Sequence, residues 1–329
     1  MNLASTYMGF DLPHPLIPGA SPLVDDLDRV RRLEDAGAPM IVMHSLFEEQ
    51  ITSEQLAMNR SMEAGVDSFA EALSYLPELG DFALGTHEYL EHVRKIKAAV
   101  SVPVIGSLNG TTEGGWLEYA RLIAEAGADG LELNLYELAT DLGETGEQVE
   151  ARGLEVVRTV RQALGIPLAV KLSPFYSSIA NFAAKLDRLG VDAILLFNRF
   201  YQPDIDVEQL EVLRVNLSSP SELLLRLRWL AVLSGRVRPS LGATGGVHTA
   251  IDAVKAVMAG AHGVQMVSAL LQRGPEHLRQ VRDDLAHWLE VHEYESLAQM
   301  QGSMNLLRCD NPKMYERANY MKILSSWEF

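Results

Sequence analysis

Polar side chains stand at the ends of several short apolar segments of this chain. Lys171 closes the segment 168–171, Asn134 follows the segment 130–133, and Asn198 follows the segment 193–197. A lysine among buried residues is costly unless it faces a partner. Lys171 could be a cation beside the ring of a cofactor, a Schiff-base lysine, or a side chain whose amine reaches solvent. The two amides could converge on one small polar ligand, or each could cap a turn.

Two further segments end in turns of small residues. Gly245 and Gly246 follow the segment 240–243, and Ser268 and Ala269 follow the segment 264–267. Paired loops of this kind hold a phosphate group in a (β/α)8 barrel, where the loops after the last two strands meet a helix N-terminus. The sequence therefore predicts a phosphate site here, without saying which chemistry the phosphate-bearing ligand performs.

Eight short apolar segments are candidates for the strands that carry these residues. They are Pro15–Pro18, Met40–Met43, Val104–Ser107, Gly130–Leu133, Leu168–Lys171, Ala193–Phe197, Ser240–Ala243 and Val264–Val267. None alternates between polar and apolar residues, which is typical of parallel strands buried on both faces. Amphipathic helical stretches lie between most of them, and four of these stretches end at a glycine that leads into the next strand, namely Gly37, Gly127, Gly190 and Gly260. This order predicts a (β/α)8 TIM barrel.

Two stretches exceed the length of one strand–helix unit. Residues 44–100 and 199–220 follow the second and sixth strands, and 211–217 within the latter indicates an extra strand. Because both follow strand carboxyl ends, where barrels carry their active sites, we expect lid or substrate-wall elements, with oligomer contact as the alternative. The whole chain, 1–329, is predicted to form one domain, with residues 286–329 as a C-terminal extension.

The composition excludes several classes of partner. The chain has 329 residues, 47% hydrophobic and 22% charged, which is typical of a soluble globular protein. Its net charge of -16 repels nucleic acid and anionic membranes, so we expect neither as a partner. A single cysteine, Cys309, cannot form a disulfide or a four-thiolate cluster within the chain. With no signal peptide or membrane-spanning run evident, these features predict a cytoplasmic protein.

Five motifs occur in order along the chain. They are Glu132-Leu-Asn-Leu, Val170-Lys-Leu, Phe197-Asn, Thr244-Gly-Gly-Val and the turn from Gln265 to Leu270. Together they resemble the dihydroorotate dehydrogenase family, including the pyrimidine-reducing domain of dihydropyrimidine dehydrogenase, over roughly residues 3–285. The resemblance implies a (β/α)8 barrel that binds FMN.

The resemblance also implies residue roles. The cofactor-binding positions would be Ala20, Ser21, Ser45, Asn109, Asn134, Lys171, Thr244, Gly245, Gly246, Ser268 and Ala269. Lys171 would face the pyrimidine edge of the flavin, where a cation stabilises charge on the reduced ring. The two glycines with Ser268 and Ala269 would hold the phosphate. Asn134 and Asn198 would bind the substrate, and no metal is implied.

The chain departs from the family at the position of the catalytic base. Where the family has a cysteine or serine, this chain has Glu137, and Ala139 replaces a substrate-binding asparagine. Glu137 could be a general base or acid, could bind a cationic or hydrogen-bond-donating substrate, or could be a solvated loop carboxylate. Tyr136 could donate a proton or form a wall of the pocket. A carboxylate here makes the anion orotate a less favourable ligand.

Three functions are therefore compatible with the sequence. The leading one is an FMN-dependent oxidoreductase acting on a CH–CH or C=C bond of a small, cyclic, pyrimidine-like substrate, with Glu137 and Lys171 as catalytic candidates. The second is a flavin-free barrel enzyme, either a Schiff-base lyase that uses Lys171 or a phosphosugar isomerase. The third is a flavin-binding protein without catalysis. For the oxidoreductase we expect a soluble acceptor or a separate redox protein, and the resemblance implies a homodimer.

Overall fold

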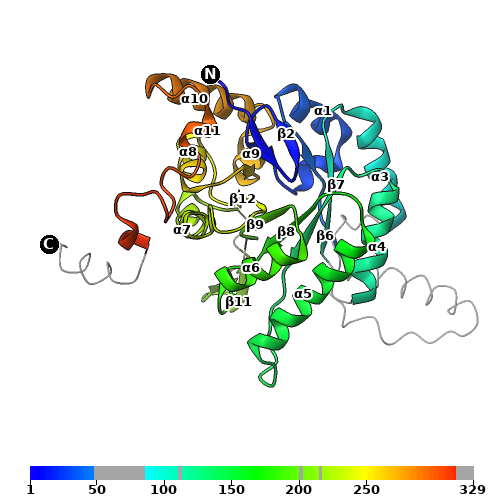
Figure 1. Ribbon diagram of the computed structural model, residues 1–329. Helices are drawn as coiled ribbons and strands as arrows, with labels where there is room; N and C mark the ends of the chain where they lie inside the picture. Colours follow the sequence, from blue (N-terminus) through cyan, green and yellow to red (C-terminus); the bar gives the residue numbers. More distant parts are fainter. Residues whose placement is uncertain (48–85, 110–112, 200–202, 215–216, 316–329) are drawn as a thin grey trace, which may run out of the picture.

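The computed structural model describes residues 1–47, 86–109, 113–199, 203–214 and 217–315 (Figure 1). Eight parallel strands form its central sheet: β3 (Leu16–Pro18), β4 (Ile41–Val42), β6 (Val104–Asn109), β7 (Gly130–Leu135), β8 (Leu168–Leu172), β9 (Ala193–Leu196), β12 (Ser240–Thr244) and β13 (Gly263–Met266). They are hydrogen-bonded in the order β3-β13-β12-β9-β8-β7-β6-β4, and β3 also contacts β4. The sheet thus curves into a nearly closed barrel, and the predicted (β/α)8 fold is confirmed.

Helices surround these strands in chain order (Figure 1). They are α1 (Leu27–Asp35), α3 (Thr86–Ala99), α4 (Glu113–Glu125), α5 (Gly146–Ala163), α6 (Ile179–Leu189), α7 (Leu223–Leu233), α8 (Ala250–Ala259), α9 (Ser268–Arg273) and α10 (His277–Val291). All four predicted glycine joints adopt positive φ, from +77° at Gly190 to +121° at Gly260. Glycine ends these helices because a side chain is strained in that conformation.

A hairpin closes the amino-terminal end of the barrel. Its strands are β1 (Ser5–Tyr7) and β2 (Phe10–Leu12), paired antiparallel. Tyr7 is 1% exposed and packs with inward-facing residues such as Ile17 and Ala169. A Cβ at Gly263 would lie 2.9 Å from the Tyr7 ring, so glycine there makes room for the tyrosine. The barrel therefore has a packed floor, and its polar side chains gather toward the opposite, carboxyl end.

Both predicted insertions contain additional elements in the described residues. After β4, the short strand β5 (Leu46–Phe47) pairs with β6, and residues 48–85 lie outside the described part of the chain. After β9, strands β10 (Pro203–Asp206) and β11 (Glu211–Arg214) form an antiparallel hairpin. The extra strand expected within 211–217 is thus present, and it ends at Arg214. The 3-10 helices η1 (Pro22–Asp25) and η2 (Pro220–Glu222) precede α1 and α7.

The described residues after α10 pack along the outside of the barrel. Residue 286, where we expected the extension to begin, lies inside α10, so the described chain leaves the barrel only after Val291. The elements that follow are α11 (Leu297–Met300) and η3 (Pro312–Tyr315). The Met304 amide donates to the Met258 carbonyl at 2.9 Å, and the Leu306 amide donates to the Ala231 carbonyl at 2.9 Å. The extension is therefore fixed to α7 and α8.

Candidate functional site

Three buried side chains form a hydrogen-bonded network inside the barrel. Glu132 on β7 is 1% exposed; its Oε1 lies 3.2 Å from Lys171 Nζ, and its Oε2 accepts from Gln265 Nε2 at 2.7 Å. Alternation along the strands turns these residues inward, since Glu132 is paired in register with the inward-facing Ala169, two residues before Lys171. The carboxylate thereby compensates the buried ammonium group and orients both neighbours.

Two acceptors in the same region have no hydrogen-bond partner among the described residues. They are Oδ1 of Asn134 and Oε1 of Gln265, both on side chains of residues less than 5% exposed. Buried polar atoms are almost always paired, so an orphaned acceptor in a cleft indicates a missing ligand. These oxygens fit a ring that carries N–H groups. A flavin and a pyrimidine both do.

Ser45 and Asn134 are brought together as the sequence predicts. Asn134 Nδ2 donates to Ser45 Oγ at 3.1 Å, and Ser45 Oγ lies 2.7 Å from Ser107 Oγ. The Ser107 carbonyl in turn accepts from the Tyr89 hydroxyl at 3.2 Å. This chain of polar groups links the loop after β4 to β6 and β7. It therefore fixes the amide of Asn134 with its carbonyl oxygen left for a ligand.

The other predicted ring-binding residues lie at strand ends around the same barrel mouth. Asn109 is the last residue of β6 and is buried, and Asn198 follows β9 and is half-buried. Ala20 and Ser21 follow β3, and Ser21 is 3% exposed. The carboxyl ends of neighbouring parallel strands meet at one rim, so these residues share the rim with Lys171.

The predicted phosphate loops are joined by a residue that the sequence reading did not single out. The Gly246 amide donates to Ser218 Oγ at 3.2 Å, and the Ser218 amide donates to Ser268 Oγ at 2.9 Å. Gly245 and Gly246 have φ of +88° and +82°. The loop after β12 and the start of α9, where Ala269 is fully buried, therefore form one small cluster of N–H and hydroxyl groups, which suits a phosphate.

A buried arginine supports this loop from below. Arg226 of α7 is 5% exposed, and its Nε donates to the carbonyl of Thr244 at 2.9 Å. A Cβ at Gly245 would lie 2.8 Å from Arg226 Nη2, so glycine permits the close approach. Burial lowers the pKa of Arg226, against the opposing effect of the Glu222 carboxylate. The side chain places positive charge directly behind the predicted phosphate site.

Glu137 does not join the barrel network in this structure. Its carboxylate pairs with Arg152 of α5, which also pairs with Glu144 at 2.6 Å. Arg152 donates hydrogen bonds to Glu144 and to Glu137, and these bonds, in that order of size, raise the pKa of Arg152. Glu137 lies beyond the end of β7 at Leu135, and its carboxylate turns to Arg152 on the following helix. Strand alternation from Glu132 places Asn134 inward as well, and it ends with β7, where the Tyr136 amide donates to the Asn134 carbonyl at 2.9 Å.

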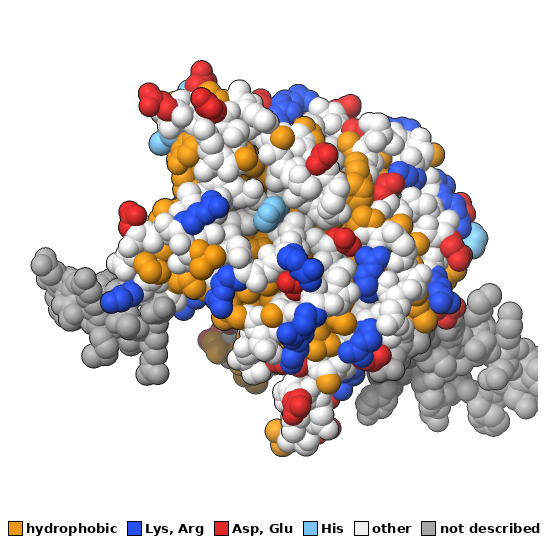
Figure 2. All heavy atoms as spheres, viewed as in Figure 1, with side chains coloured by type: hydrophobic (Ala, Val, Ile, Leu, Met, Phe, Trp, Pro, Cys, Tyr) orange, Lys and Arg blue, Asp and Glu red, His pale blue; other side chains and the backbone are white. Residues whose placement is uncertain are grey.

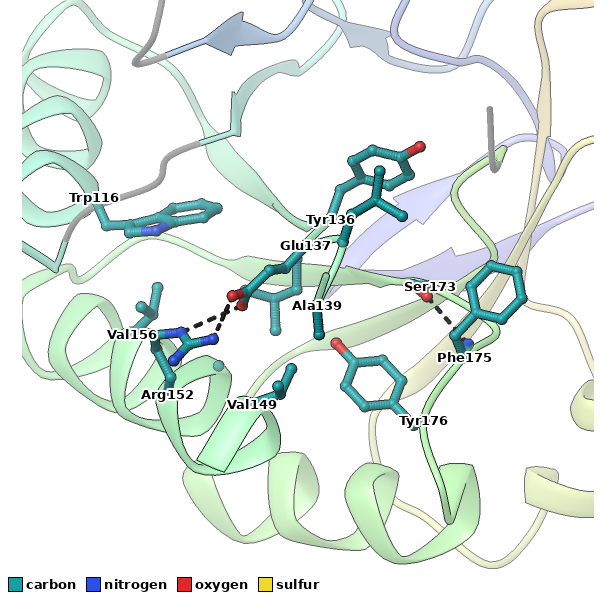
Figure 3. A pocket seen from close by; sticks show the side chains of 13 residues that line it. Trp116, Tyr136, Glu137, Ala139, Val149, Arg152, Val156, Ser173, Phe175 and Tyr176 are labelled. Atoms are coloured by element: carbon teal, nitrogen blue, oxygen red, sulfur yellow. Dashed lines mark hydrogen bonds and ion pairs between the residues drawn. The ribbon is translucent and has the colours of Figure 1, made fainter. Parts of the chain in front are cut away.

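A cavity of about 450 Å³ lies beneath this loop (Figure 3). It is lined by Trp116, Leu135, Tyr136, Glu137, Leu138, Ala139, Val149, Arg152, Gly153, Val156, Ser173, Phe175 and Tyr176. Figure 3 shows Glu137 reaching toward Arg152 while the ring of Tyr136 points away from that pair. The cavity therefore lies between the rim of the barrel and the helices α4, α5 and α6.

The part of the chain that the structure describes has neither a cluster of metal ligands nor a membrane-spanning helix. No group of three or more histidine, cysteine, aspartate or glutamate side chains there could hold a metal ion. No described helix combines the length and apolar character needed to cross a membrane.

A nearly closed parallel barrel with a buried lysine and a glycine turn at its carboxyl rim is typical of cofactor-dependent barrel enzymes. A family model described as dihydroorotate dehydrogenase matches residues 68–289. The chain belongs to the dihydroorotate dehydrogenase family, as the sequence motifs indicate.

Individual relatives are similar over most of the barrel. The putative dihydroorotate dehydrogenase A (fumarate) of Aeropyrum pernix is 31% identical over 208 residues, 61% of this chain and 67% of that protein. The NAD-dependent dihydropyrimidine dehydrogenase subunit PreA of Escherichia coli is 24% identical over 328 residues, covering 92% of this chain and 77% of the relative. The catalytic subunit of dihydroorotate dehydrogenase B (NAD(+)) of Thermoplasma acidophilum is 26% identical over 227 residues, 66% of this chain and 73% of its own.

Proposed function

We propose that this protein is an FMN-dependent oxidoreductase acting on a CH–CH or C=C bond of a small, cyclic, pyrimidine-like substrate. The observation that supports this most is the buried network of Lys171, Glu132 and Gln265 in a barrel of the dihydroorotate dehydrogenase family. A flavin-free enzyme using Lys171 as a Schiff base is disfavoured, because the Glu132 carboxylate holds that amine as a buried ion pair.

The residues that would hold FMN fit the group. Lys171 offers an ammonium for the pyrimidine edge, and Asn134 and Gln265 offer acceptors for ring N–H groups. The Ser218 and Ser268 hydroxyls offer donors for the phosphate, the Gly246 amide fixes the Ser218 hydroxyl, and Arg226 lies behind them. Ala20, Ser21, Ser45, Asn109, Thr244, Gly245 and Ala269 complete the set we propose. When bound, FMN would supply hydride chemistry.

The chain's own residues then orient the substrate and move a proton. Asn134 and Asn198 would bind the substrate's polar edge. Glu137 remains our candidate base, and it can act only after its carboxylate leaves Arg152. Tyr136 is the neighbouring residue, and its ring points away from the pair of Glu137 and Arg152 (Figure 3). The variants Glu137→Gln and Tyr136→Phe separate the two. Loss of a general base slows the chemical step by on the order of 100-fold, whereas an unchanged rate removes that residue from the proton transfer.

The decisive experiment uses the purified full chain. We expect it to carry FMN or to take it up, giving a yellow protein, and we expect its flavin absorbance to bleach anaerobically with a dihydropyrimidine. Dihydroorotate and dihydrouracil are the first two substrates to compare. A protein that neither contains nor binds FMN would refute the proposal. A yellow protein that no reduced ring bleaches would favour the flavin-binding protein without catalysis.

The electron acceptor and assembly are also proposals. The relatives include catalytic subunits by name, which supports a separate redox protein as acceptor. For a homodimer, the exposed leucines of α7 offer a surface: Figure 2 shows hydrophobic side chains gathered over this helix, where Leu224 is 66% and Leu225 42% exposed. Sedimentation of the wild type against Leu224→Lys tests this. The cytoplasmic location rests on the acidic, cysteine-poor composition alone.

A further inference from the structure

The cavity beneath the loop after β7, which we name the rim cavity, adjoins the strand ends that carry Asn134 and Lys171. Tyr136 and Ser173 line it and directly follow β7 and β8, each two residues beyond one of those side chains. Leu135 and Val156 also line it, and they belong to the hydrophobic layer between β7 and α5. The cavity therefore extends from the rim near Asn134 and Lys171 outward to the helices.

Aromatic groups form much of its wall. Trp116 of α4 is 5% exposed, and Tyr176 stacks on Phe182 of α6 with ring centroids 4.1 Å apart. Burial, and then the charges of Glu137 and Glu150, raise the pKa of Tyr176, so its hydroxyl stays protonated and neutral. This hydroxyl faces Ala139 in Figure 3. Flat, polarisable walls of this kind favour a planar apolar group.

The charged groups of the wall are already paired with each other. Arg152 binds both Glu137 and Glu144, so one cation faces two carboxylates. An anionic ligand group would have to displace Glu137 and would then lie near its charge. An uncharged group leaves the cluster intact. The electrostatics therefore select against a carboxylate such as that of orotate.

We propose that the rim cavity is a substrate subsite that binds an uncharged, planar apolar substituent on the ring held at Asn134 and Lys171. This rests on the proposed function and narrows its substrate class to pyrimidine-like rings with an aryl or similar arm in place of the carboxylate of orotate. About 450 Å³ is within the usual range of ligand pockets, roughly 300–1,000 Å³. Ala139 is small and borders the space, so its replacement of the family's asparagine opens the subsite.

The test measures binding to the FMN-loaded, oxidised full-length protein by perturbation of the flavin spectrum. The probes are uracil, orotate, 6-benzyluracil and 6-(4-carboxybenzyl)uracil, all unsaturated rings that donate no hydride to the oxidised flavin. We expect 6-benzyluracil to bind tighter than uracil by on the order of tenfold or more, since a filled apolar pocket contributes at least that much. Orotate and the carboxybenzyl compound should bind more weakly than 6-benzyluracil.

Variants tie the preference to the cavity. Ala139→Phe fills the cavity and should remove most of the preference in affinity for 6-benzyluracil over uracil. Val149→Phe does the same from α5, should the loop variant misfold. Thr140→Phe adds the same ring at the next, exposed residue, outside the lining, and should leave the ratio unchanged.

Three binding results would overturn the subsite: equal affinity for uracil and 6-benzyluracil, tighter binding of the carboxybenzyl compound than of 6-benzyluracil, or no binding of either ring by the yellow protein. It would also be overturned if Thr140→Phe lowered the affinity ratio between 6-benzyluracil and uracil as much as Ala139→Phe does. Failure of the protein to bind FMN is a separate result that removes the proposed function itself. The two failures are therefore distinguishable.

Discussion

Two ion pairs at the same strand of the barrel differ in almost every physical respect. Lys171 and Glu132 lie inside, with side chains 8% and 1% exposed, whereas Arg152 and Glu137 lie at the rim, 37% and 46% exposed. Glu132 lies within β7 and faces the interior, whereas Glu137 follows the end of that strand and reaches Arg152 on α5.

The comparison separates a fixed part of the site from an adaptable one. A buried pair is strongly coupled, because removing one partner leaves an uncompensated charge out of water. An exposed pair contributes little and is easily exchanged for other contacts. We therefore expect the interior to tolerate almost no change in charge, while the loop 136–139 can vary and so set the choice of substrate.

The largest effect is expected for Lys171→Met. It leaves the Glu132 carboxylate buried beside a neutral side chain, and the free energy of unfolding should fall by about 3–5 kcal/mol. Urea denaturation of the protein without added cofactor measures this directly. The double variant Lys171→Met with Glu132→Gln removes both charges and should regain much of the loss. A double variant as unstable as the sum of the single ones would show that the two residues are not coupled.

A smaller effect is expected at the phosphate loop. Gly246→Ala places a Cβ in a positive-φ conformation and only 2.5 Å from the Leu223 amide nitrogen. The free energy of unfolding should fall by about 2 kcal/mol or more, and FMN affinity should fall with it. Gly165→Ala is the matched control, because its Cβ would meet no atom within 4 Å. If Gly246→Ala and Gly165→Ala change the free energy of unfolding and the FMN affinity equally, the loop is not part of the fixed region.

Tyr7→Phe probes the floor of the interior network. The Tyr7 hydroxyl is fully buried without a hydrogen-bond partner among the described residues, and burial together with Glu132 raises its pKa. Removing an unsatisfied hydroxyl should leave the free energy of unfolding unchanged or raise it by up to about 1 kcal/mol. A loss of more than about 1 kcal/mol in thermal or urea denaturation would mean that the hydroxyl contributes to the network after all.

The smallest effect on stability is expected for Glu137→Gln. Its pair with Arg152 is about half exposed, and Arg152 keeps Glu144, so the free energy of unfolding should change by less than about 1 kcal/mol. Comparison of urea midpoints with Lys171→Met gives the contrast between rim and interior. A loss equal to that of the interior variant would break the comparison on which this view of the site rests.

The fold could be predicted because its signals are local. Short apolar runs, amphipathic helices and terminal glycines each depend on a few neighbouring residues, and all eight strands appear where these signals place them. The helices α6 and α8 end at Leu189 and Ala259, directly before the predicted terminal glycines Gly190 and Gly260. The positions of Lys171 and Asn134 at strand ends could be predicted for the same reason.

The site was harder to predict because its contacts are not local. Gln265 and Glu132 are 133 residues apart and meet only when the barrel closes. Ser218 lies in the insertion after β9, and residue spacing in the sequence does not show where that insertion packs against the barrel. The direction of Glu137 could not be predicted either, because it follows the end of β7, where the alternation of side chains no longer applies. Its partner Arg152 lies 15 residues further along the chain, on the following helix.

The floor made by the first hairpin gives the amino terminus an influence on the chemistry. Tyr7 separates the underside of Glu132 from bulk solvent, so any change that loosens residues 5–12 would admit water to the one carboxylate that keeps Lys171 in place. A purification tag near these residues would therefore affect the proposed cofactor site from the opposite end of the barrel. The first hairpin thus contributes to that proposed site, as the loops at the carboxyl rim do.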